Sequence, residues 1–223
     1  MIYIIVVSDI HGNYPLYMKY KELWEDEIIF LGDVIDCNGD YPDQSTEILD
    51  DIKSEKKSKG FKVLCGNHEA SNWVGGYMFE NNSLLVNHFK QNIRGRNSGV
   101  LQPFYDEYVS LMQEFPLYHV TCNGCFLSHA GPPRIAQELG FLSLTWNYMD
   151  EVNEVDISSF LEENSLKTMA VGHNHPKNYK IKHKMLTFNS GNGYYLDINE
   201  EVFMDIMYLE NCVKRLEDVE SVF

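Results

Sequence analysis

The chain has 223 residues, of which 44% are hydrophobic and 23% are charged, a length that suits one domain with a large core or two small ones. The formal net charge is −15, from 33 acidic and 18 basic residues, so the surface repels polyanions and a nucleic-acid polymer is disfavoured as a substrate. The dense basic run from Lys53 to Lys59 is interpreted as a solvated helix end. Since no apolar stretch is long enough to cross a bilayer, we expect no membrane association.

The chain begins with an apolar, β-branched run, Ile2 to Val7. No basic segment precedes this run, and it is too short for the apolar core of a secretory signal. It leads directly into Ser8-Asp9-Ile10-His11, a pattern typical of a buried strand that ends in functional polar residues. We therefore expect a strand here and a cytoplasmic protein.

The first third of the chain alternates predicted strands and helices. Continuous apolar runs indicate buried strands, and apolar residues confined to one face indicate helices. Pro15 near the start of the first helix and Gly60 after the second mark helix boundaries. The predicted elements are strand 2–7, helix 13–25, strand 28–31, helix 43–58 and strand 61–65. This order implies a parallel sheet with both faces covered.

The remainder of the chain predicts a second sheet. Residues 70–101, which carry Gly and Asn pairs, are interpreted as an irregular, partly helical insertion, and a helix is predicted at 104–115. Short strands are expected at 117–121, 126–128, 168–171, 185–188, 194–198 and 202–208. The predicted fold class is α/β, a layered sandwich of two mixed β-sheets flanked by helices, in a single domain over residues 1–223.

The five cysteines are an odd number and do not form a disulfide framework. Cys122-Asn123-Gly124-Cys125 has the spacing of half a zinc site, but no second cysteine pair lies near it in the sequence. Asn-Gly between two β-rich runs predicts a hairpin turn. A metal or redox role for the two cysteines is the alternative.

Polar residues follow the predicted strands directly. The first strand ends in Asp9-x-His11, the second in Gly32-Asp33-x-x-Asp36 and the third in Gly66-Asn67-His68-Glu69. Two later strand-like segments end in Ser128-His129-Ala130-Gly131 and in Gly172-His173-Asn174-His175. Because ligands bind at the carboxyl ends of parallel strands, these motifs should meet in space.

The converging side chains are carboxylates, imidazoles and one amide. Histidine with carboxylate, and without a convincing cysteine, suits Mn, Fe, Zn, Ni or Co, whereas calcium takes oxygen only. The donors are too many for one ion and fit two ions that share a carboxylate. Each motif alone could be purely structural, as a turn, a helix start or a buried histidine. The occurrence of all five motifs, each directly after a predicted strand, makes a purely structural interpretation weak. The set comprises Asp9, His11, Asp33, Asp36, Asn67, His68, His129, His173 and His175.

In these motifs the sequence resembles the calcineurin-like metallophosphoesterase superfamily. All five motifs occur in the family's order, from residue 9 to residue 175. The resemblance implies two divalent metal ions, with manganese favoured, and a bridging carboxylate from Asp33. The implied ligands of the first metal are Asp9, His11 and His175. Those of the second metal are Asn67, His129 and His173.

The resemblance also implies a catalytic pair that binds no metal. His68 would be the general acid at the leaving-group oxygen, with Asp36 orienting its ring and keeping it protonated. Two cations about 4 Å apart would clamp the phosphoryl oxygens and bridge a hydroxide that attacks phosphorus in line.

Within the superfamily, the sequence is similar to the phosphoprotein phosphatase branch, which includes serine/threonine phosphatases, bacteriophage phosphatases and symmetrical diadenosine tetraphosphate hydrolases. The segments that carry this similarity are residues 8–13, 64–69 and 128–133 and the tripeptide Leu144-Thr145-Trp146. Two arginines that clamp phosphate in that branch are replaced here by Cys37 and Asn147. The candidate substitutes for binding substrate are Arg134, Arg94 and Arg96.

Three functions are compatible with this pattern. The first is a phosphomonoesterase that acts on a phosphoprotein or a small phosphorylated molecule. The second is a nucleotide hydrolase or phosphodiesterase, which His175 favours because it is typical of general phosphodiesterase members. Trp73, Tyr77 and Phe79 would then be available to stack on a base, although local packing explains such aromatics more simply. The third is a non-catalytic scaffold, which the complete ligand set disfavours.

Overall fold

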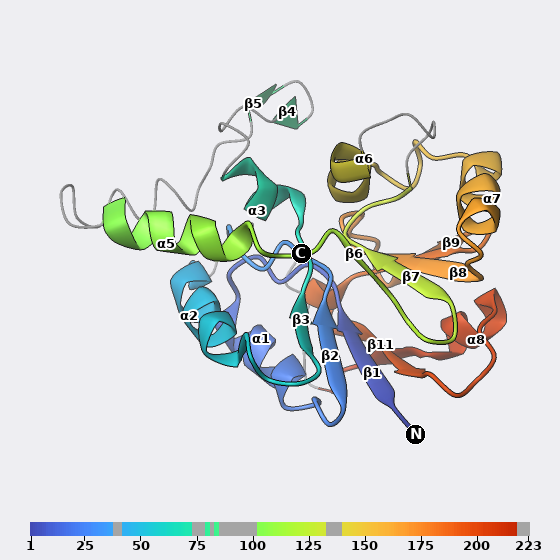
Figure 1. Cartoon of the computed structure of the whole chain (residues 1–223), viewed down its shortest axis with the longest axis horizontal. Coiled ribbons are helices and arrows are strands. Elements are labelled where there is room, and N and C mark those ends of the chain that lie inside the picture. Colours follow the sequence, from blue (N-terminus) through green and yellow to red (C-terminus); the bar gives the residue numbers. More distant parts are fainter. Residues whose placement is uncertain (38–41, 73–78, 81–82, 85–101, 133–139, 218–223) are drawn as a thin grey trace.

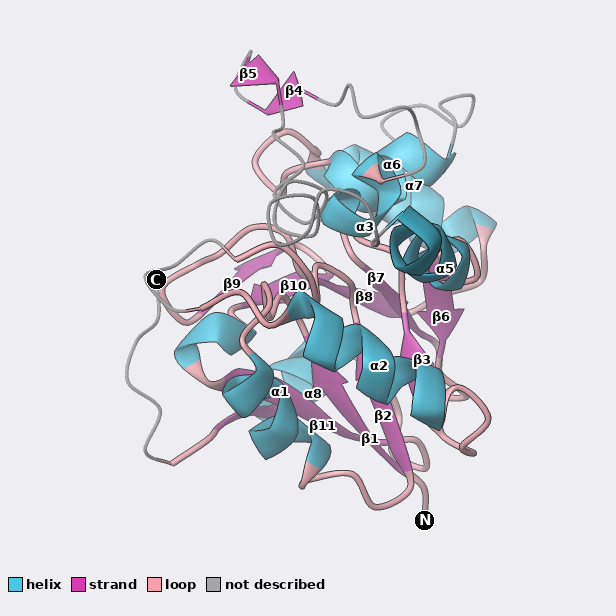
Figure 2. Ribbon diagram, turned by 90° about the vertical axis from the view of Figure 1, so that its left-hand side faces the viewer, coloured by secondary structure: helices cyan, strands magenta, loops and turns pink. Residues whose placement is uncertain are grey.

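Two five-stranded β-sheets pack face to face in the computed structural model, with helices on both outer faces (Figures 1 and 2). The structure describes residues 1–37, 42–72, 79–80, 83–84, 102–132 and 140–217. The layered sandwich of two mixed sheets predicted from the sequence is confirmed. Within the described ranges, no helix is both long and apolar enough to span a bilayer.

The first sheet has the strand order β12-β11-β1-β2-β3. Its strands are β1 (Tyr3–Val7), β2 (Glu27–Phe30), β3 (Phe61–Val63), β11 (Tyr194–Asn199) and β12 (Val213–Arg215). β1, β2 and β3 are parallel, with Val7 opposite Phe30, and β11 runs antiparallel to β1. The crossovers between the parallel strands are α1 (Tyr14–Lys21) and α2 (Ser45–Glu55). The parallel β-α-β-α-β start is therefore as predicted.

The second sheet has the order β6-β7-β8-β10-β9. Its strands are β6 (Tyr118–Val120), β7 (Cys125–Ser128), β8 (Thr168–Val171), β9 (Tyr179–Lys182) and β10 (Met185–Phe188). β7, β8 and β10 are parallel, and the edge strands β6 and β9 are antiparallel to their neighbours. Each sheet therefore contains three adjacent parallel strands, and the carboxyl ends of these strands lie along one edge of the sheet.

Smaller elements complete the described fold. The helices are α3 (Asn67–Ser71), α5 (Gln102–Met112), α6 (Gly140–Trp146), α7 (Glu154–Glu163), α8 (Ile206–Asn211) and the 3₁₀ helix η1 (Ser190–Asn192). A two-stranded sheet pairs β4 (Phe79–Glu80) with β5 (Ser83–Leu84). Most of the predicted insertion at 70–101 lies outside the described residues. The single-domain organisation stays a prediction.

Alternate side chains of β1 pack into two different hydrophobic cores. Ile4 and Val6 face the second sheet and pack in a buried cluster with residues such as Leu127. Ile5 and Val7 face the opposite way, into the cluster formed with α1, α2 and α5. A third cluster lies between the second sheet and helices α6 and α7. Each fully buried aliphatic side chain contributes roughly 1.5–3 kcal/mol, so the strands that end at the site are held from both faces.

The prediction of a strand at 202–208 is wrong. Asp205 caps a helix there, because its side chain accepts the backbone N–H of Tyr208 at 2.7 Å and α8 starts at Ile206. Phe203, an apolar residue that suggested a strand, is 73% exposed. Helices α6 and α7 and strands β9 and β12 were not predicted.

The hairpin predicted at Cys122–Cys125 is confirmed. β6 and β7 pair antiparallel on either side of this turn, with Val120 opposite Phe126. Cys125 is buried between the sheets, whereas Cys122 is exposed, and both are free thiols. The two sulfurs of this turn therefore lie in different environments, one in solvent and one in the core.

Candidate active site

The five sequence motifs meet at the carboxyl ends of the parallel strands. Asp9 lies two residues after β1, Asp33 three after β2, and Asn67 starts the helix that follows β3. In the second sheet, His129 directly follows β7 and His173 lies two residues after β8. Asp33 from the first sheet and His129 from the second approach within 3.3 Å, so the two edges form one site.

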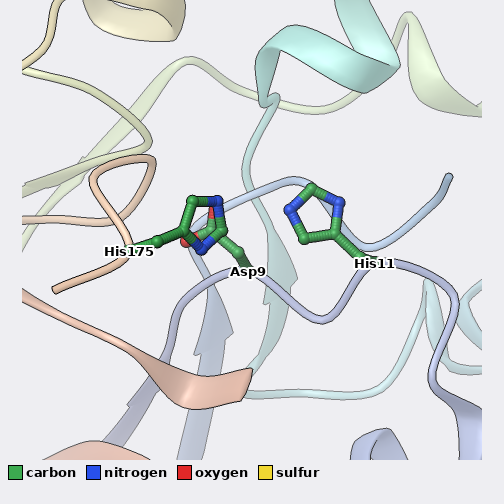
Figure 3. A group of neighbouring side chains, drawn as sticks. All are labelled: Asp9, His11 and His175. Atoms are coloured by element: carbon green, nitrogen blue, oxygen red, sulfur yellow. The ribbon is translucent and has the colours of Figure 1, made fainter. Parts of the chain in front are cut away.

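Asp9, His11 and His175 form one candidate metal-binding group, as Figure 3 shows. One ligand atom from each lies within 4.8 Å of the others. Nε2 of His175 is 3.8 Å from Oδ1 of Asp9, and the rings of His11 and His175 are 5.3 Å apart between centroids. Asp9 and His11 are buried, while the His175 side chain is 34% exposed and closes the group towards solvent.

Asp33, His129 and His173 form a second candidate group, also within 4.8 Å. Nε2 of His129 lies 2.9 Å from Oδ1 of Asn67, so the amide predicted from the third motif joins this group. Asp33 also belongs to a third group with His11 and His68. A carboxylate placed between neighbouring donor groups is suited to bridge two ions.

The donor atoms have the environment that a divalent cation requires. Among the described residues, Nδ1 of His129 and Nε2 of His173 are buried nitrogens without any hydrogen-bond partner. Leaving a buried polar atom unpaired costs roughly 1–3 kcal/mol, and a bound cation removes that cost. The burial of these imidazoles together with Asp9 and Asp33 therefore fits a metal centre of nitrogen and oxygen donors.

His68 and Asp36 form a buried pair beside this centre. Nδ1 of His68 lies 3.0 Å from Oδ2 of Asp36, and Nε2 lies 3.9 Å from Oδ2 of Asp33. Burial lowers the pKa of His68, but the carboxylates of Asp33 and Asp36 outweigh it and raise this pKa to about 10. These carboxylates therefore favour the protonated form of the ring, with one nitrogen held by Asp36 and the other directed towards the donor groups.

Five site residues adopt the left-handed backbone region. Their φ angles are +48° for His11, +49° for Asp33, +63° for Asp36, +61° for His173 and +37° for His175. Such a conformation costs a non-glycine residue on the order of 1–3 kcal/mol. Strain of this kind persists where surrounding contacts fix the chain and is concentrated at functional sites.

The buried carboxylate of Glu69 holds two of the loops. Its oxygens accept backbone N–H groups from Asp33 at 2.8 Å, Val34 at 2.9 Å, Ile35 at 3.3 Å and Gly66 at 2.9 Å. Burial and the nearby charge of Asp33 raise the pKa of Glu69 to about 7. The sequence placed Glu69 in its third motif without a role, and only the folded loops show that it fixes the backbone around Asp33.

Two glycines allow close approach to the carboxylates. A Cβ on Gly66 would lie 2.2 Å from Oδ1 of Asp33, and a Cβ on Gly172 would lie 2.6 Å from Oδ2 of Asp9. The backbone N–H of His173 donates to both oxygens of Asp9, at 3.1 and 3.0 Å. The motif glycines thus make room for main-chain contacts with Asp9 and Asp33.

The residues that replace the two clamping arginines have other partners. Nδ2 of Asn147 donates to the carbonyl of Pro132 at 2.9 Å and so supports the segment after His129. Cys37 is half-buried beside Asp36. The candidate anchors Arg94, Arg96 and Arg134 lie outside the described residues, as do Trp73 and Tyr77 and the side chain of Phe79.

One aromatic contact at the site was not foreseen. The half-buried Tyr148 ring lies 4.3 Å from the ring of His173 at a tilt of 35°, and Trp146 lies 6.3 Å from the same ring. Trp146 was noted in the sequence as part of a motif, but nothing in the sequence indicated Tyr148.

The chain matches a known protein family over most of its length. The sequence profile of the calcineurin-like phosphoesterases matches residues 2–208. The chain belongs to the calcineurin-like phosphoesterase family, and it is a phosphoric ester hydrolase. Among proteins of curated function, no sequence matches it.

Solved structures share the fold at low identity. A protein serine/threonine phosphatase from Saccharomyces cerevisiae has 17% identity and a TM-score of 0.71, over 98% of this chain and 81% of that one. A cold-active protein-tyrosine phosphatase from a psychrophilic Shewanella species has 16% identity and a TM-score of 0.65, over 89% and 76%. A candidate diadenosine tetraphosphatase has 15% identity and a TM-score of 0.53, over 96% and 92%. These likenesses concern the fold.

Proposed function

We propose that the protein is a dinuclear-metal phosphoesterase that hydrolyses phosphate monoesters, with His68 as general acid. The observation that carries this proposal is the buried His68–Asp36 pair, 3.0 Å apart, directed at the carboxylate of Asp33. This carboxylate is shared by neighbouring donor groups, so the acid lies beside the place where two metal ions would sit.

The residues assigned to the metals follow the two donor groups. We assign Asp9, His11 and His175 to the first ion, Asn67, His129 and His173 to the second, and Asp33 to both. Two bound divalent ions would neutralise phosphoryl oxygens and lower the pKa of a coordinated water. The nitrogen and oxygen donors suit Mn, Fe, Zn, Ni or Co, and manganese is the ion we favour.

The protein's own part in the reaction is to hold and deliver a proton. Asp36 accepts the Nδ1–H of His68, which fixes the imidazolium ring so that Nε2 faces Asp33. From that position Nε2–H would donate to the leaving-group oxygen as its bond to phosphorus breaks. Protonation of an alkoxide leaving group by a positioned acid accelerates such a step about 10²–10⁴-fold.

A nucleotide hydrolase or phosphodiesterase is the second candidate. His175 lies with Asp9 and His11, where it would be the third protein ligand of the first ion. Since the sequence resembles general phosphodiesterase members at His175, its place in this group is the observation that supports the second candidate. We propose Arg134, Arg94 and Arg96 as phosphate anchors for either substrate class.

The test compares two esters in protein that is first stripped of metal and then loaded with Mn. We expect hydrolysis of p-nitrophenyl phosphate to exceed that of bis-p-nitrophenyl phosphate, and His68→Ala to reduce activity on both, although by less than on an ester whose leaving group needs protonation. His183→Ala is the matched control, because His183 is exposed in a turn and bonds to Ser158 at 2.8 Å. A preference for the diester would transfer the proposal to the second candidate. Absence of metal-dependent activity on both, in metal-loaded protein, would contradict both candidates.

A further inference from the structure

Two buried serines join the ends of β1 and β10 beside Asp9. Ser8 directly follows β1, and Ser190 begins η1, two residues after β10. The backbone N–H of Ser8 donates to Oγ of Ser190 at 2.8 Å, and the backbone N–H of Ser190 donates to Oγ of Ser8 at 3.1 Å. Both residues are fully buried. Since β1 belongs to the first sheet and β10 to the second, this Ser8–Ser190 pair joins the two sheets at the edge where the site lies.

Each hydroxyl of the pair also donates its own proton. Oγ of Ser8 donates to the carbonyl of Phe188, the last residue of β10, at 3.1 Å, and Oγ of Ser190 donates to the carbonyl of Tyr194 at 2.7 Å. A serine hydroxyl has one proton to donate, so each hydroxyl here is fully used as a donor and also accepts one N–H. Alanine at either position would therefore leave a buried N–H of the other serine without its acceptor.

The hydroxyl of Ser190 takes the place of a bond in the ladder between β1 and β11. These strands pair antiparallel, with Val6 opposite Leu196. Continued by two residues, this register places Ser8 opposite Tyr194. The N–H of Ser8 and the carbonyl of Tyr194 instead both bond to the Ser190 hydroxyl, which lies between them. The inserted hydroxyl separates the two strands where β1 ends, so the chain leaves the sheet at this point and enters the site.

Asp9 is consequently held from both sides. Its neighbour Ser8 is tied to the end of β10, and its own carboxylate accepts the backbone N–H of His173. The end of β10 also supports the segment before His173, because Oγ1 of Thr187 donates to the carbonyl of Gly172 at 3.2 Å. The same strand end therefore fixes the backbone on the two sides of the Asp9 carboxylate.

Helix α1 supports the pair from behind. The buried hydroxyl of Tyr20 donates to the carbonyl of Ser190 at 2.7 Å. α1 starts three residues after His11, so one helix connects the first metal-ligand motif with the pair. Tyr20 also offers a variant, Tyr20→Phe, that removes one hydroxyl and keeps the ring in the core.

We propose that Ser8 and Ser190 are positioning residues for the first metal ion. Through Asp9 they set how the donor atoms of Asp9, His11 and His175 are arranged, and hence how tightly this group binds its ion. The inference rests on the dinuclear site proposed above, and neither serine is assigned a contact with ion or substrate. Outer partners that orient a metal ligand typically contribute 10–100-fold in metal affinity.

The test is isothermal titration calorimetry of metal-free protein with Mn²⁺. We expect two binding steps in the unaltered chain and expect Asp9→Asn to abolish the step that belongs to the first ion. Ser190→Ala should weaken that same step about tenfold or more and leave the other step unchanged. Tyr20→Phe should weaken it to a smaller extent. The double variant Ser8→Ala with Ser190→Ala should weaken it no further than either single change, because the two hydroxyls act as one unit.

Electron paramagnetic resonance gives a second readout that needs no catalysis. Two bridged Mn²⁺ ions give a spin-coupled spectrum, whereas a lone ion gives the spectrum of isolated Mn²⁺. At a manganese concentration that just saturates the unaltered chain, Ser190→Ala should replace the coupled spectrum with that of the isolated ion. Circular dichroism verifies that each variant is folded at the temperature of titration, and Tyr20→Phe carries the test if Ser190→Ala does not fold.

Thr121→Ala is the matched control. Thr121 is also buried, and its hydroxyl likewise accepts a backbone N–H, from Cys125 at 2.9 Å, and donates to Asn123 at 2.6 Å. It lies before the start of β7, at the opposite end of that strand from His129. This variant should lose stability as any buried hydroxyl deletion does, but it should bind both manganese ions like the unaltered chain.

Three results would overturn the positioning role. The first is unchanged binding of both ions by the folded serine variants and by Tyr20→Phe. The second is equal weakening of both steps, and the third is a loss in Thr121→Ala as large as in Ser190→Ala, since either would show a general loosening of the fold. An unaltered chain that binds fewer than two ions would contradict the dinuclear proposal itself and the positioning role with it, and that result is recognised without any variant.

Discussion

Oγ of Ser45, the first residue of α2, lies 3.0 Å from the backbone nitrogen of Asp36 and accepts its N–H. The same hydroxyl donates to Oδ1 of Asp43 at 2.5 Å, so its orientation is fixed. Asp36 is held in the left-handed region, with φ of +63°, and from there its carboxylate reaches His68. The start of α2 therefore supports the pair that we assign to proton transfer.

The first prediction is that Ser45→Ala reduces kcat about 10-fold on phenyl phosphate and less on p-nitrophenyl phosphate. Loss of the hydroxyl loosens Asp36 and hence His68, and a poor leaving group depends most on the acid; outer partners of this kind typically contribute 10–100-fold. Steady-state kinetics with both esters measure the difference. Ser45→Thr keeps the hydroxyl and should restore activity, while Thr46→Ala, which removes an exposed contact to Glu47, should have no effect. Equal losses on both esters would refute a role through the acid.

The second prediction concerns His68 itself. His68→Asn should lower kcat on phenyl phosphate by about 10²–10⁴-fold, with a smaller loss on p-nitrophenyl phosphate, whose leaving group needs little protonation. Metal content, measured by mass spectrometry of the purified protein, should stay the same, because no metal-binding role is assigned to this ring. If the variant instead loses metal, His68 is a ligand and the assignment of the general acid is wrong.

The third prediction concerns stability. Glu69→Gln should lower the free energy of unfolding by about 2–4 kcal/mol, since the amide of glutamine turns a donor towards the N–H groups that the carboxylate accepts. Urea denaturation monitored by circular dichroism measures the change. Glu22→Gln, at an exposed position, is the matched control and should stay within about 0.5 kcal/mol. A similar small change for Glu69→Gln would mean that the loops do not depend on this carboxylate.

Most of the sheets could be predicted because their strands are apolar runs. Residues 168–171 and 185–188 coincide with β8 and β10, which are buried along their whole length. β9, Tyr179–Lys182, is an edge strand of alternating lysines whose pairing with β10 is a tertiary effect. The prediction of a strand at 202–208 was wrong because the side chain of Asp205 caps a helix there, although the surrounding residues are apolar.

The site motifs were predictable for a different reason. Metal-binding residue types directly after buried strands converge within each sheet wherever the strands are parallel. The contact of Asp33 with His129 joins the two sheets and depends on how the sheets pack. The supports of the site were not predictable. Glu69 and Ser45 act through backbone groups of other loops, 36 residues away for Asp33 and Glu69 and nine residues away for Asp36 and Ser45. Only the contact of Glu69 with Gly66, three residues apart in a capping box, has a local sequence pattern.

The last prediction concerns metal binding and tests the shared carboxylate. Manganese at about 100 times its dissociation constant stabilises the folded chain by about 2.7 kcal/mol per site. In a protein of this size that corresponds to a rise in Tm of roughly 5–10 °C. Asp33→Asn removes the negative charge proposed to bridge both ions, so it should abolish most of this rise. Asp150→Asn removes an 80% exposed carboxylate that pairs with Lys180, and it should leave the rise unchanged. Differential scanning fluorimetry with and without Mn²⁺ measures both variants. A full rise in Asp33→Asn would show that the two donor groups bind their ions separately, and the bridging role would have to be abandoned.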